Sequence, residues 1–405
     1  MKNKEKAISG LARVKRWLYT QEGGERGAGC VLCGSCYGHG PVNPMEDEPG
    51  FQTKCPPYEY YRFQRFTPKS RWLMSQRVFH GLDAITPELK EVIYTCTTCL
   101  MCQETCGVIK DAGPWDIAVA MREEITKTEG PIDAHRPLLE ALRRENNPWG
   151  SPAAKRGAWS KGLGLKELGA HRARTLLFAG CSADRPEGRG AAAALAKLMQ
   201  KAGEDFVVLG AAESCCGLYA RDLGFRDEYN RLQKLNINTV TEAGIRTVVV
   251  ACGSCRRIWG EYPRDEMQHV RVVHAVEYLD DLVRQGRLKF NKRVSKKVTY
   301  HDPCHLGRGA GVYDAPRNLL RAIPGVDLVE MPRNRRWSWC CGGGGGVPEA
   351  YPDLTKWNAE DRLREAKATG AELLLTTSAV CHRSFDLAQK ILPTRELLEF
   401  VAESL

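Results

Sequence analysis

Residues 337–350 read WSWCCGGGGGVPEA, which places two adjacent cysteines before five consecutive glycines. Three kinds of structure can carry such a stretch: a phosphate cradle, a flexible linker, or one edge of a metal centre. A P-loop needs Lys-Ser or Lys-Thr after its last glycine, and neither follows Gly346. A free linker is disfavoured because the cysteines fix one end. Glycine is expected here for positive φ and for close backbone approach to a bulky group.

The stretch has a counterpart earlier in the chain. Residues 213–219 read ESCCGLY, about 125 residues before SWCCGGG at 338–344. Three further pairs lie at similar separations: RTLLFAGC (174–181) with KVTYHDPC (297–304), RTVVVACGSC (246–255) with AELLLTTSAVC (371–381), and HVRVVHAVEYLDDLV (269–283) with QKILPTRELLEFVAE (389–403). Such self-similarity indicates a tandem duplication of one structural unit.

Each copy predicts an α/β unit in the order strand, helix, strand, cysteine-pair loop, helix, strand, helix. In the first copy the strands are TLLFAG, FVVLG and TVVVAC, and a helix is expected over 190–202. Continuous apolar strands that alternate with helices indicate a buried parallel sheet, whose ligands lie beyond the carboxyl ends of the strands. The cysteines expected at those ends are Cys181, Cys215, Cys216, Cys252 and Cys255 in the first copy, and Cys304, Cys340, Cys341 and Cys381 in the second.

Two more cysteine groups precede the repeats, in CVLCGSC (30–36) with KCPP (54–57), and in CTTCLMCQETCG (96–107). In two-cluster ferredoxins, three cysteines of a C-x2-C-x2-C-x3-C run hold one [4Fe-4S] cluster and the fourth ligates the other. This crossing rule predicts one set of Cys30, Cys33, Cys36 and Cys106, and a second set of Cys96, Cys99, Cys102 and Cys55. Zinc is the alternative, but zinc ribbons use pairs of C-x2-C.

The fold class predicted is α+β followed by α/β: a mainly helical two-cluster ferredoxin domain, then two tandem α/β domains with parallel sheets. Helices are expected over 87–94, 115–128 and 133–146. The predicted segments are a basic helix or arm over 1–24, the ferredoxin-like domain over 25–146, a linker over 147–172, and the α/β domains over 173–290 and 295–405. The arm can dock on a membrane partner or pack on its own ferredoxin domain.

Bulk properties exclude several function classes. The chain has 405 residues and a net charge of +10, but its basic residues alternate with acidic ones, so no nucleic-acid partner is expected. All 17 cysteines fall into the four groups, and no secretory signal is recognised, which favours metal or catalytic thiols over disulfides. No apolar run of membrane-spanning length occurs. We therefore expect a cytoplasmic protein, soluble or peripheral to the inner face of the membrane.

The pattern Cys, CCG, C-x2-C, present twice behind two ferredoxin motifs, resembles the CCG-domain iron–sulfur proteins. YHDPCHLGR (300–308) and CCGGGG are specific to that family, and the resemblance covers about residues 25–400. The most similar type is the D subunit of heterodisulfide reductase. Related chains are the iron–sulfur subunits of glycolate oxidase and of anaerobic glycerol-3-phosphate dehydrogenase.

The resemblance implies a noncubane [4Fe-4S] cluster on the five cysteines of the first copy. The second copy departs from the pattern, because Ser378 stands where Cys252 stands in the first. Its four cysteines can hold a further iron–sulfur cluster or zinc, or the site can be empty. An iron with an open position there is a place where substrate sulfur can bind.

Three histidines flank cysteines of the second copy: His301, His305 and His382. His305 and His382 are the predicted catalytic residues, since histidine can donate a proton to a leaving thiolate near neutral pH. Hydrogen bonds to cluster sulfur or to the backbone are the alternative role. Arg333, Arg335 and Arg336 can hold an anionic substrate or partner, or can be plain surface charge.

Two functions remain open from the sequence. In the first, single electrons pass through the ferredoxin-type clusters to the noncubane cluster, which reduces a disulfide. In the second, the chain is a relay without its own substrate, linking a flavoprotein or catalytic subunit to quinone or ferredoxin, as in 2-hydroxy-acid, glycerol-3-phosphate or benzoyl-CoA reductase type complexes. No flavin or nicotinamide fingerprint is present. Partner redox subunits are therefore expected: a flavoprotein, a ferredoxin or a membrane cytochrome or quinone subunit.

Overall fold

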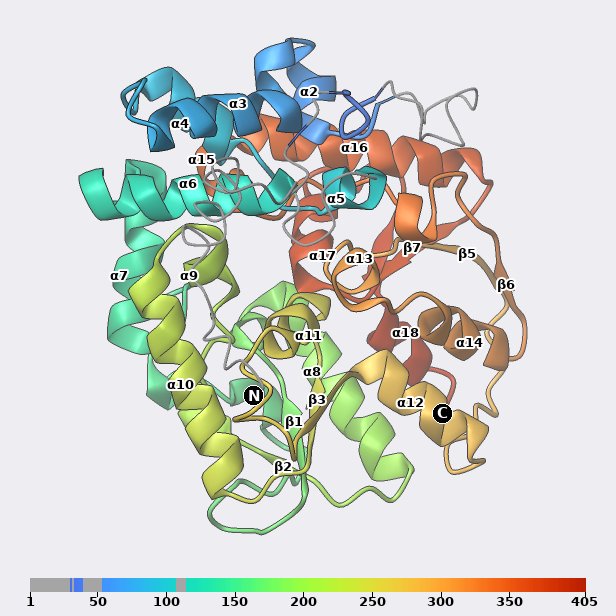
Figure 1. Cartoon of the computed structure of the whole chain (residues 1–405). Helices are drawn as coiled ribbons and strands as arrows, with labels where there is room; N and C mark the ends of the chain where they lie inside the picture. Colours follow the sequence, from blue (N-terminus) through green and yellow to red (C-terminus); the bar gives the residue numbers. More distant parts are fainter. Residues whose placement is uncertain (1–29, 31–32, 39–52, 107–113) are drawn as a thin grey trace, which may run out of the picture. The chain divides into compact units, whose positions relative to one another are not determined.

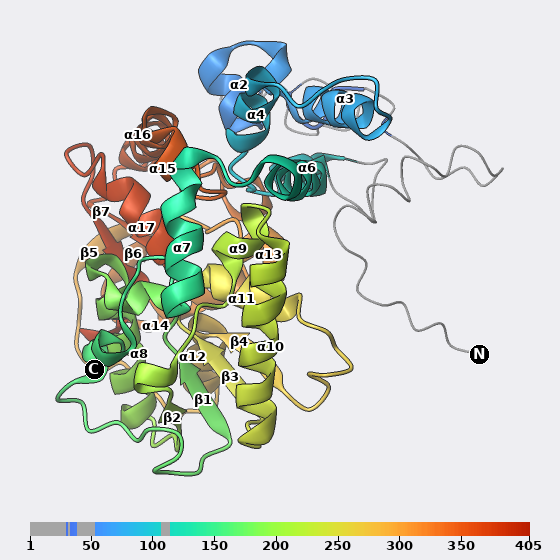
Figure 2. The same cartoon turned by 90° about the vertical axis from the view of Figure 1, so that its left-hand side faces the viewer.

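The computed structural model describes residue 30 and residues 33–38, 53–106 and 114–405. These residues form two compact units, drawn in Figures 1 and 2: one joins the chain up to residue 136 with 219–226 and 342–358, and the other holds 137–218, 227–341 and 359–405. The predicted arm over 1–24 lies outside the described residues. Among the described helices, none combines the length and apolar character needed to cross a membrane.

The first unit is helical. Its helices are α2 (Pro56–Tyr61), η2 (Gln64–Phe66), α3 (Pro68–Phe79), α4 (Pro87–Tyr94), α5 (Met101–Thr105), α6 (Pro114–Glu129), η3 (Asp133–His135) and α15 (Val347–Ala350). Thr67 and Thr86 start α3 and α4, because each hydroxyl accepts an N–H of the first turn and a proline follows each cap. The helix predicted over 87–94 is α4, and the one over 115–128 is α6.

Three helices contain residues of both units: α9 (Leu218–Asp222), α10 (Arg226–Glu242) and α16 (Pro352–Ala368). The first two follow the cysteine pair of the first repeat, and α16 follows the pair of the second. The segments after the two cysteine pairs, 219–226 and 342–358, are therefore parts of the helical unit, although they belong to the α/β repeats in sequence.

The second unit contains two four-stranded sheets, all parallel, ordered β2-β1-β3-β4 and β6-β5-β7-β8. The strands are β1 (Thr175–Phe178), β2 (Val207–Val208), β3 (Thr247–Val250), β4 (Arg271–His274), β5 (Lys296–Tyr300), β6 (Val326–Leu328), β7 (Leu373–Thr376) and β8 (Thr394–Glu396). The remaining helices are α7 (Arg136–Glu145), η4 (Ala153–Lys155), η5 (Ala158–Ser160), η6 (Cys181–Asp184), α8 (Pro186–Lys201), η7 (Gly210–Ala212), α11 (Gly253–Gly260), α12 (Ala275–Arg284), α13 (Gly307–Ala310), α14 (Asp314–Ala322), η8 (Arg335–Trp337), α17 (Ala379–Asp386) and α18 (Leu397–Ala402). The predicted fold class and duplication are confirmed.

The sequence pattern missed one strand in each repeat. The edge strands β4 and β8 run directly into α12 and α18, so their short apolar pattern merges with the helical pattern that follows. The predicted strand FVVLG is reduced to β2, two residues long. The helix expected over 190–202 begins four residues earlier, as α8, because Pro186 fits the first turn.

The two repeats pack through helices. One hydrophobic cluster contains buried residues of α8, α12, α14 and α18 together with β1, β3, β5 and β7, and Figure 1 shows these helices between the two sheets. Helix α8 contacts α18, and α12 contacts α14. The first long helix of each repeat thus meets the last helix of the other, which is the pattern of a pseudo-twofold relation between the repeats.

The topology directs the cysteines to one edge of each sheet. In the order β2-β1-β3-β4 the chain leaves β1 for β2 on one side and returns to β3 on the other, so the carboxyl ends of β1 and β3 frame the switch point where such sheets bind ligands. Cys181 follows β1, and Cys252 follows β3 as the N-cap of α11. In the second repeat, Ser378 is likewise the N-cap of α17. The sequence alignment of Ser378 with Cys252 therefore holds in three dimensions.

Candidate functional site: four convergent cysteine sets

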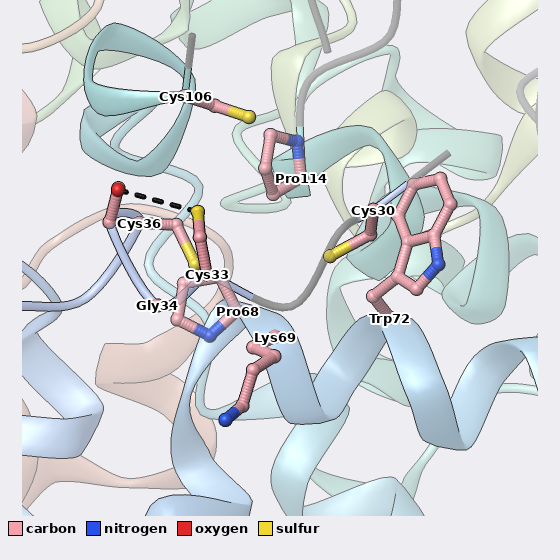
Figure 3. Close-up of a pocket in the computed structure, with 10 residues that line it drawn as sticks. Cys30, Cys33, Gly34, Cys36, Pro68, Lys69, Trp72, Cys106 and Pro114 are labelled. Atoms are coloured by element: carbon pink, nitrogen blue, oxygen red, sulfur yellow. Dashed lines mark hydrogen bonds between the residues drawn. The ribbon is translucent and has the colours of Figure 1, made fainter. Parts of the chain in front are cut away.

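Cys30, Cys33, Cys36 and Cys106 line one hollow of about 400 Å³, shown in Figure 3 with Trp72 and Pro114. Cys36 is buried and Cys33 is exposed, with its sulfur 3.4 Å from the Ser35 hydroxyl. Burial is the largest cause that raises the pKa of Cys36 to about 12, followed by the neighbouring cysteines. We call this the first hollow, and its four cysteines are the set that the crossing rule predicts.

A second hollow of about 370 Å³ is lined by Cys55, Cys96, Cys99 and Cys102. Burial raises the pKa of Cys55 to about 11 and that of Cys102 well above its ordinary value. Pro68 and Pro114 line both hollows, and the electrostatic influence of Cys55 reaches Cys36, so the hollows adjoin. Cluster ligation by these two sets stays a prediction.

Two buried arginines carry positive charge beside the second hollow. Arg71 donates from Nη1 to Cys55 Sγ at 3.7 Å and from Nε to the Val92 carbonyl at 2.8 Å. Arg122 donates to five carbonyl oxygens at 2.7–3.3 Å: those of Ile93, Tyr94, Cys96, Asp222 and Gly345. The Asp222 carboxylate acts on Arg122 electrostatically, but its ion pair is with Arg221.

A buried charge without a counter-ion costs several kcal/mol or more. Burial opposes the charge of Arg71, yet the thiols of Cys96 and Cys55 raise its pKa. The counter-charge that this hollow offers is therefore thiolate sulfur. Two buried and two partly buried cysteines beside two buried cations fit an anionic, thiolate-ligated cluster.

The pentaglycine packs against this second set. A Cβ on Gly344 would lie 2.3 Å from the Thr97 carbonyl oxygen, and one on Gly345 would lie 2.4 Å from that of Cys96. Gly345 also has φ of +63°. The expectation of close approach and positive φ is met, and the neighbouring group is the backbone of a cysteine loop. Any side chain here would displace the Cys96–Thr97 segment.

The first cysteine-rich site brings together the five cysteines predicted for the first repeat. Cys181 Sγ lies 3.8 Å from Cys215 Sγ, and Cys216 and Cys252 each interact with Cys255. The cysteine-pair turn is held by its carbonyls: Asn236 donates to the Cys215 oxygen at 3.0 Å, and the Tyr262 hydroxyl donates to the Cys216 oxygen at 2.9 Å. Five thiols converging at one sheet edge suit a polynuclear iron–sulfur site better than a four-coordinate zinc ion.

The second cysteine-rich site has four cysteines, with Cys341 Sγ 3.2 Å from Cys381 Sγ. The Ser378 hydroxyl hydrogen-bonds Cys381, and this bond lowers the pKa of Cys381 against the larger effects of Cys341 and burial, which raise it well above normal. The two sites adjoin across the repeats, because Cys252 accepts a hydrogen bond from the backbone N–H of Ala379. The serine that replaces a cysteine is therefore next to the cysteine set of the other repeat.

His301 reaches the second site in an orientation that the sequence did not predict. Its ring nitrogen, Cys341 Sγ and Cys381 Sγ lie within 4.8 Å of one another, a geometry that can also hold a metal ion. However, Arg362 Nε donates to His301 Nδ1 at 3.1 Å, so Nδ1 has no proton. Burial lowers the pKa of His301, which keeps the ring neutral, and the ring interacts with Cys341. The neutral ring therefore carries its proton on Nε2, which disfavours metal coordination at that atom. This buried Nε2 has no hydrogen-bond partner among the described residues, although the ring lies beside Cys341 and Cys381.

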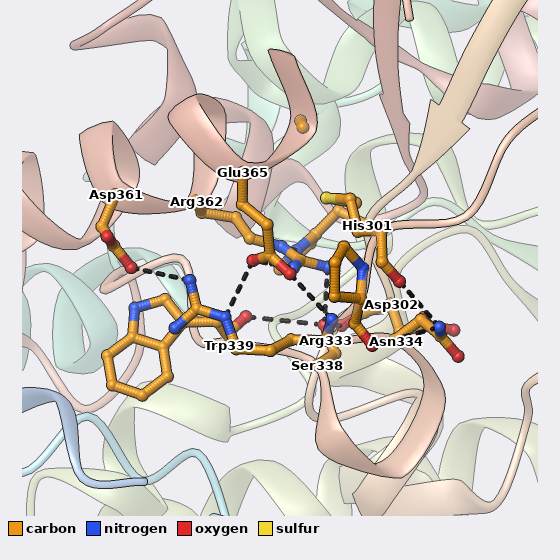
Figure 4. A network of polar contacts seen from close by, with 12 residues as sticks. His301, Asp302, Arg333, Asn334, Ser338, Trp339, Asp361, Arg362 and Glu365 are labelled. Atoms are coloured by element: carbon orange, nitrogen blue, oxygen red, sulfur yellow. Dashed lines mark hydrogen bonds and ion pairs between the residues drawn. The ribbon is translucent and has the colours of Figure 1, made fainter. Parts of the chain in front are cut away.

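A polar network fixes this histidine, as Figure 4 shows. Arg362 Nη1 donates to Glu365 at 2.6 Å, and Glu365 also accepts from the backbone and side chain of Arg333. Arg333 pairs in addition with Asp361 and stacks on Trp339, 4.7 Å from the ring centroid. Arg333 is thus neutralised within the fold. It is not poised for an anionic substrate, which was one of the two sequence interpretations.

The two predicted catalytic histidines occupy different surroundings. His305 is buried, and its Nδ1 lies 3.0 Å from the hydroxyl of Ser254, which stands between Cys252 and Cys255 in the first repeat. His382 Nδ1 lies 3.4 Å from the Glu187 carbonyl. His305 therefore reaches from the second repeat to the first cysteine-rich site, whereas the described contacts of His382 are with Glu187 and Asp386. Their catalytic role stays a prediction.

Comparison with known proteins agrees with this arrangement. A family model described as a cysteine-rich domain matches residues 175–258 and 298–386. The chain is 32% identical over 394 residues, 93% of each chain, to the D subunit of the dihydromethanophenazine:CoB–CoM heterodisulfide reductase of Methanosarcina mazei. It is 35% identical over 267 residues, 63% of this chain and 37% of the other, to the EtfAB:quinone oxidoreductase of Syntrophomonas wolfei.

A hypothetical protein from Helicobacter pylori shares the fold, with a TM-score of 0.54, 10% identity, and coverage of 90% of this chain and 69% of the other. At that identity the likeness concerns the fold alone. The match to the M. mazei protein is of a different kind, because it runs along nearly the whole of both chains. The chain therefore belongs to the family of heterodisulfide reductase D subunits, with two cysteine-rich domains in tandem.

Proposed function

We propose that this chain carries single electrons through two ferredoxin-type clusters to a cysteine-rich centre that reduces a disulfide. Family membership makes it an iron–sulfur redox subunit. The observation that carries the proposal is the division of eight N-terminal thiols into two adjoining hollows, with nine more thiols in two adjoining sites. Such an arrangement suits a chain of redox centres better than isolated structural metal ions.

The proposed cofactors follow the thiol sets. Each hollow holds a [4Fe-4S] cubane, the first cysteine-rich site a noncubane [4Fe-4S] cluster, and the second a further iron–sulfur cluster, with zinc as the alternative. An iron–sulfur cluster supplies one-electron storage and, where an iron is open, a position for sulfur. The protein supplies the thiolates, the hydrogen bonds that hold the cysteine-pair turns, and the buried arginines.

Disulfide reduction consumes two electrons and two protons and yields two thiols. The electrons come one at a time from a partner chain. His305 is the proposed proton donor at the first site, because its ring is fixed against Ser254 between two cysteines of that site. His382 is the proposed donor at the second, from its position next to Cys381.

An electron relay without its own substrate is the second candidate, and the likeness to an EtfAB:quinone oxidoreductase favours it. In either case the partners are other redox subunits: a flavoprotein, a ferredoxin, or a membrane cytochrome or quinone subunit. We propose a cytoplasmic location, soluble or peripheral to the inner membrane face through such a partner. We further propose a ferredoxin-like domain over 25–146 and two α/β domains over 173–290 and 295–405.

The test is anaerobic purification of the full chain, with iron, sulfide and zinc quantified and EPR recorded after oxidation with and without a thiol. Four clusters correspond to about 16 iron atoms, and three to about 12 with the second cysteine-rich site free of iron. A thiol-dependent signal that Cys216→Ser abolishes and Cys99→Ser leaves intact supports disulfide chemistry. Absence of that signal, together with rapid reduction of a quinone analogue, supports the relay and contradicts the disulfide proposal.

A further inference from the structure

The two ferredoxin-type hollows differ in the charge that faces them. The second hollow is lined by Lys54 and Arg71, and Arg122 lies directly behind its Cys96 carbonyl. Lys54 is 5%, Arg71 2% and Arg122 0% exposed. The first hollow has one cation among its described lining residues, Lys69, whose ammonium lies over the Tyr37 ring at 5.6 Å from the centroid.

Charge and hydrogen bonding at the sulfurs set the reduction potential of an iron–sulfur centre. Reduction adds one negative charge, and a buried cation stabilises that charge several times more strongly than an exposed one, because the local dielectric constant is lower. Arg71 acts in both ways, since its Nη1 also donates to Cys55 Sγ. Cys33 is exposed, so the charge of Lys69 acts on the first hollow through solvent, which screens it.

We infer that Arg71 and Arg122 raise the reduction potential of the centre held by Cys55, Cys96, Cys99 and Cys102 above that of the centre held by Cys30, Cys33, Cys36 and Cys106, so that electrons enter at the first hollow and pass to the second. The inference rests on the proposed cluster content of the two hollows. In the step, one electron leaves the first centre, which is oxidised, and enters the second, which is reduced; no proton moves.

Arg122 also contacts the segments that follow the cysteine pairs of the two cysteine-rich sites. Its guanidinium donates to the carbonyl oxygens of Cys96, Asp222 and Gly345. Cys96 belongs to the second ferredoxin-type cysteine group, and the other two lie in the segments 219–226 and 342–358. The same cation that stabilises the reduced centre thus orders the segments leading to both cysteine-rich sites. Arg122 is a positioning residue in this sense, because it is in contact with main-chain carbonyls and not with sulfur.

The experiment is a redox titration of the anaerobic full chain, followed by EPR. Cys33→Ala and Cys99→Ala assign the signals to the first and second centres. We expect the second centre to be reduced at the more positive potential. Arg71→Gln keeps a hydrogen-bond donor but removes the charge. It should lower the reduction potential of the second centre by at least about 59 mV, which is a tenfold change in the equilibrium constant of its one-electron reduction.

Two variants serve as controls. Arg71→Lys keeps the charge and should retain most of the potential, and Arg77→Gln removes an exposed, Asp83-paired arginine from the same helix and should change neither centre. The inference is overturned if the wild-type first centre has the higher potential, or if Arg71→Gln shifts both centres equally. The wild-type order of the two potentials does not depend on Arg71→Gln, so misfolding of that variant leaves the test intact. If the two hollows together held less iron than two [4Fe-4S] clusters contain, that result would instead contradict the proposed function.

Discussion

The close approach of the pentaglycine to the Cys96 loop predicts a large destabilisation when Gly345 is replaced by alanine. Two separate costs add. The residue has φ of +63°, which disfavours an L side chain by about 1–2 kcal/mol. The new Cβ would also lie 2.4 Å from the Cys96 oxygen, and relieving such overpacking in a buried region costs about 1–3 kcal/mol. We expect a total loss of about 2–5 kcal/mol.

The two costs can be measured apart with matched variants of the same unit. Gly130 has φ of +82°, and a Cβ added there would have nothing within 4 Å, so Gly130→Ala should show the backbone cost alone. Gly344 has no positive φ, but its Cβ would lie 2.3 Å from the Thr97 oxygen, so Gly344→Ala should show the steric cost alone. A loss for Gly345→Ala near the sum of the two controls is the expected result.

The assay is urea unfolding of the helical unit, followed through the EPR signal and visible absorbance of the second centre, because a two-unit chain need not unfold in one transition. The displaced Cys96 carbonyl should also lower iron retention in Gly345→Ala and Gly344→Ala, but not in Gly130→Ala. The reasoning is refuted if Gly345→Ala and Gly130→Ala have the same midpoint and the same iron content, since that would mean that the loop yields freely at Cys96.

Three further outcomes are expected. Burial lowers the pKa of His135 to about 4, with a smaller effect of Arg122, while its Nε2 donates to the Gly346 carbonyl at 2.8 Å. Between these two pKa values the unfolded chain binds a proton that the folded chain excludes. The free energy of unfolding should therefore fall by about 3 kcal/mol as the pH drops from 6.5 to 4. Urea unfolding at a series of pH values measures this dependence, and His135→Gln should weaken it. Cys55→Ser should alter the EPR signal of the second hollow and Cys106→Ser that of the first; the opposite pattern would contradict the crossed ligation. Ser378→Cys should raise the thiolate count of the second cysteine-rich site to five, detected as a change in its EPR signal or metal content with no change at the first site.

Much of the molecule is predictable from the cysteines alone, because thiol ligation imposes fixed spacing on the chain. The cysteines grouped by the crossing rule line common hollows, and the duplicated pattern places five and four thiols at equivalent sheet edges. Arg71 and Arg122 could not be singled out in this way, because an arginine in a helix carries no periodic signal. Their importance comes from burial next to cysteine loops that lie elsewhere in the sequence, and only tertiary structure reveals that.

The edge strands show a second limit. β4 and β8 have four and three residues, and each continues into a helix whose apolar spacing dominates the local pattern. Their strand conformation comes from pairing with β3 and β7, which is a non-local contact. Similarly, the assignment of segments 219–226 and 342–358 to the helical unit depends on contacts with Arg122, not on any property of the segments' own sequence.

The two cysteine-rich sites have diverged in more than one ligand, and the changes fit one another. In the repeat alignment His301 takes the place of Phe178. Arg362 takes the place of Asn236 when the equally long helices α10 and α16 are aligned end to end. Phe178 packs edge-on against Trp259 in the first repeat, whereas in the second Arg362 donates to His301 Nδ1 and holds the ring beside Cys341.

The second repeat thus has a hydroxyl at Ser378 where the first has the thiol of Cys252, and it has a neutral imidazole beside Cys341. Fewer thiolates lower the negative charge on a bound centre, which favours its reduced state over that of the five-thiolate site. Where both sites hold iron–sulfur centres, we therefore expect the second to be the better electron acceptor, and a redox titration of the wild type beside Ser378→Cys, which should remove the difference, checks this.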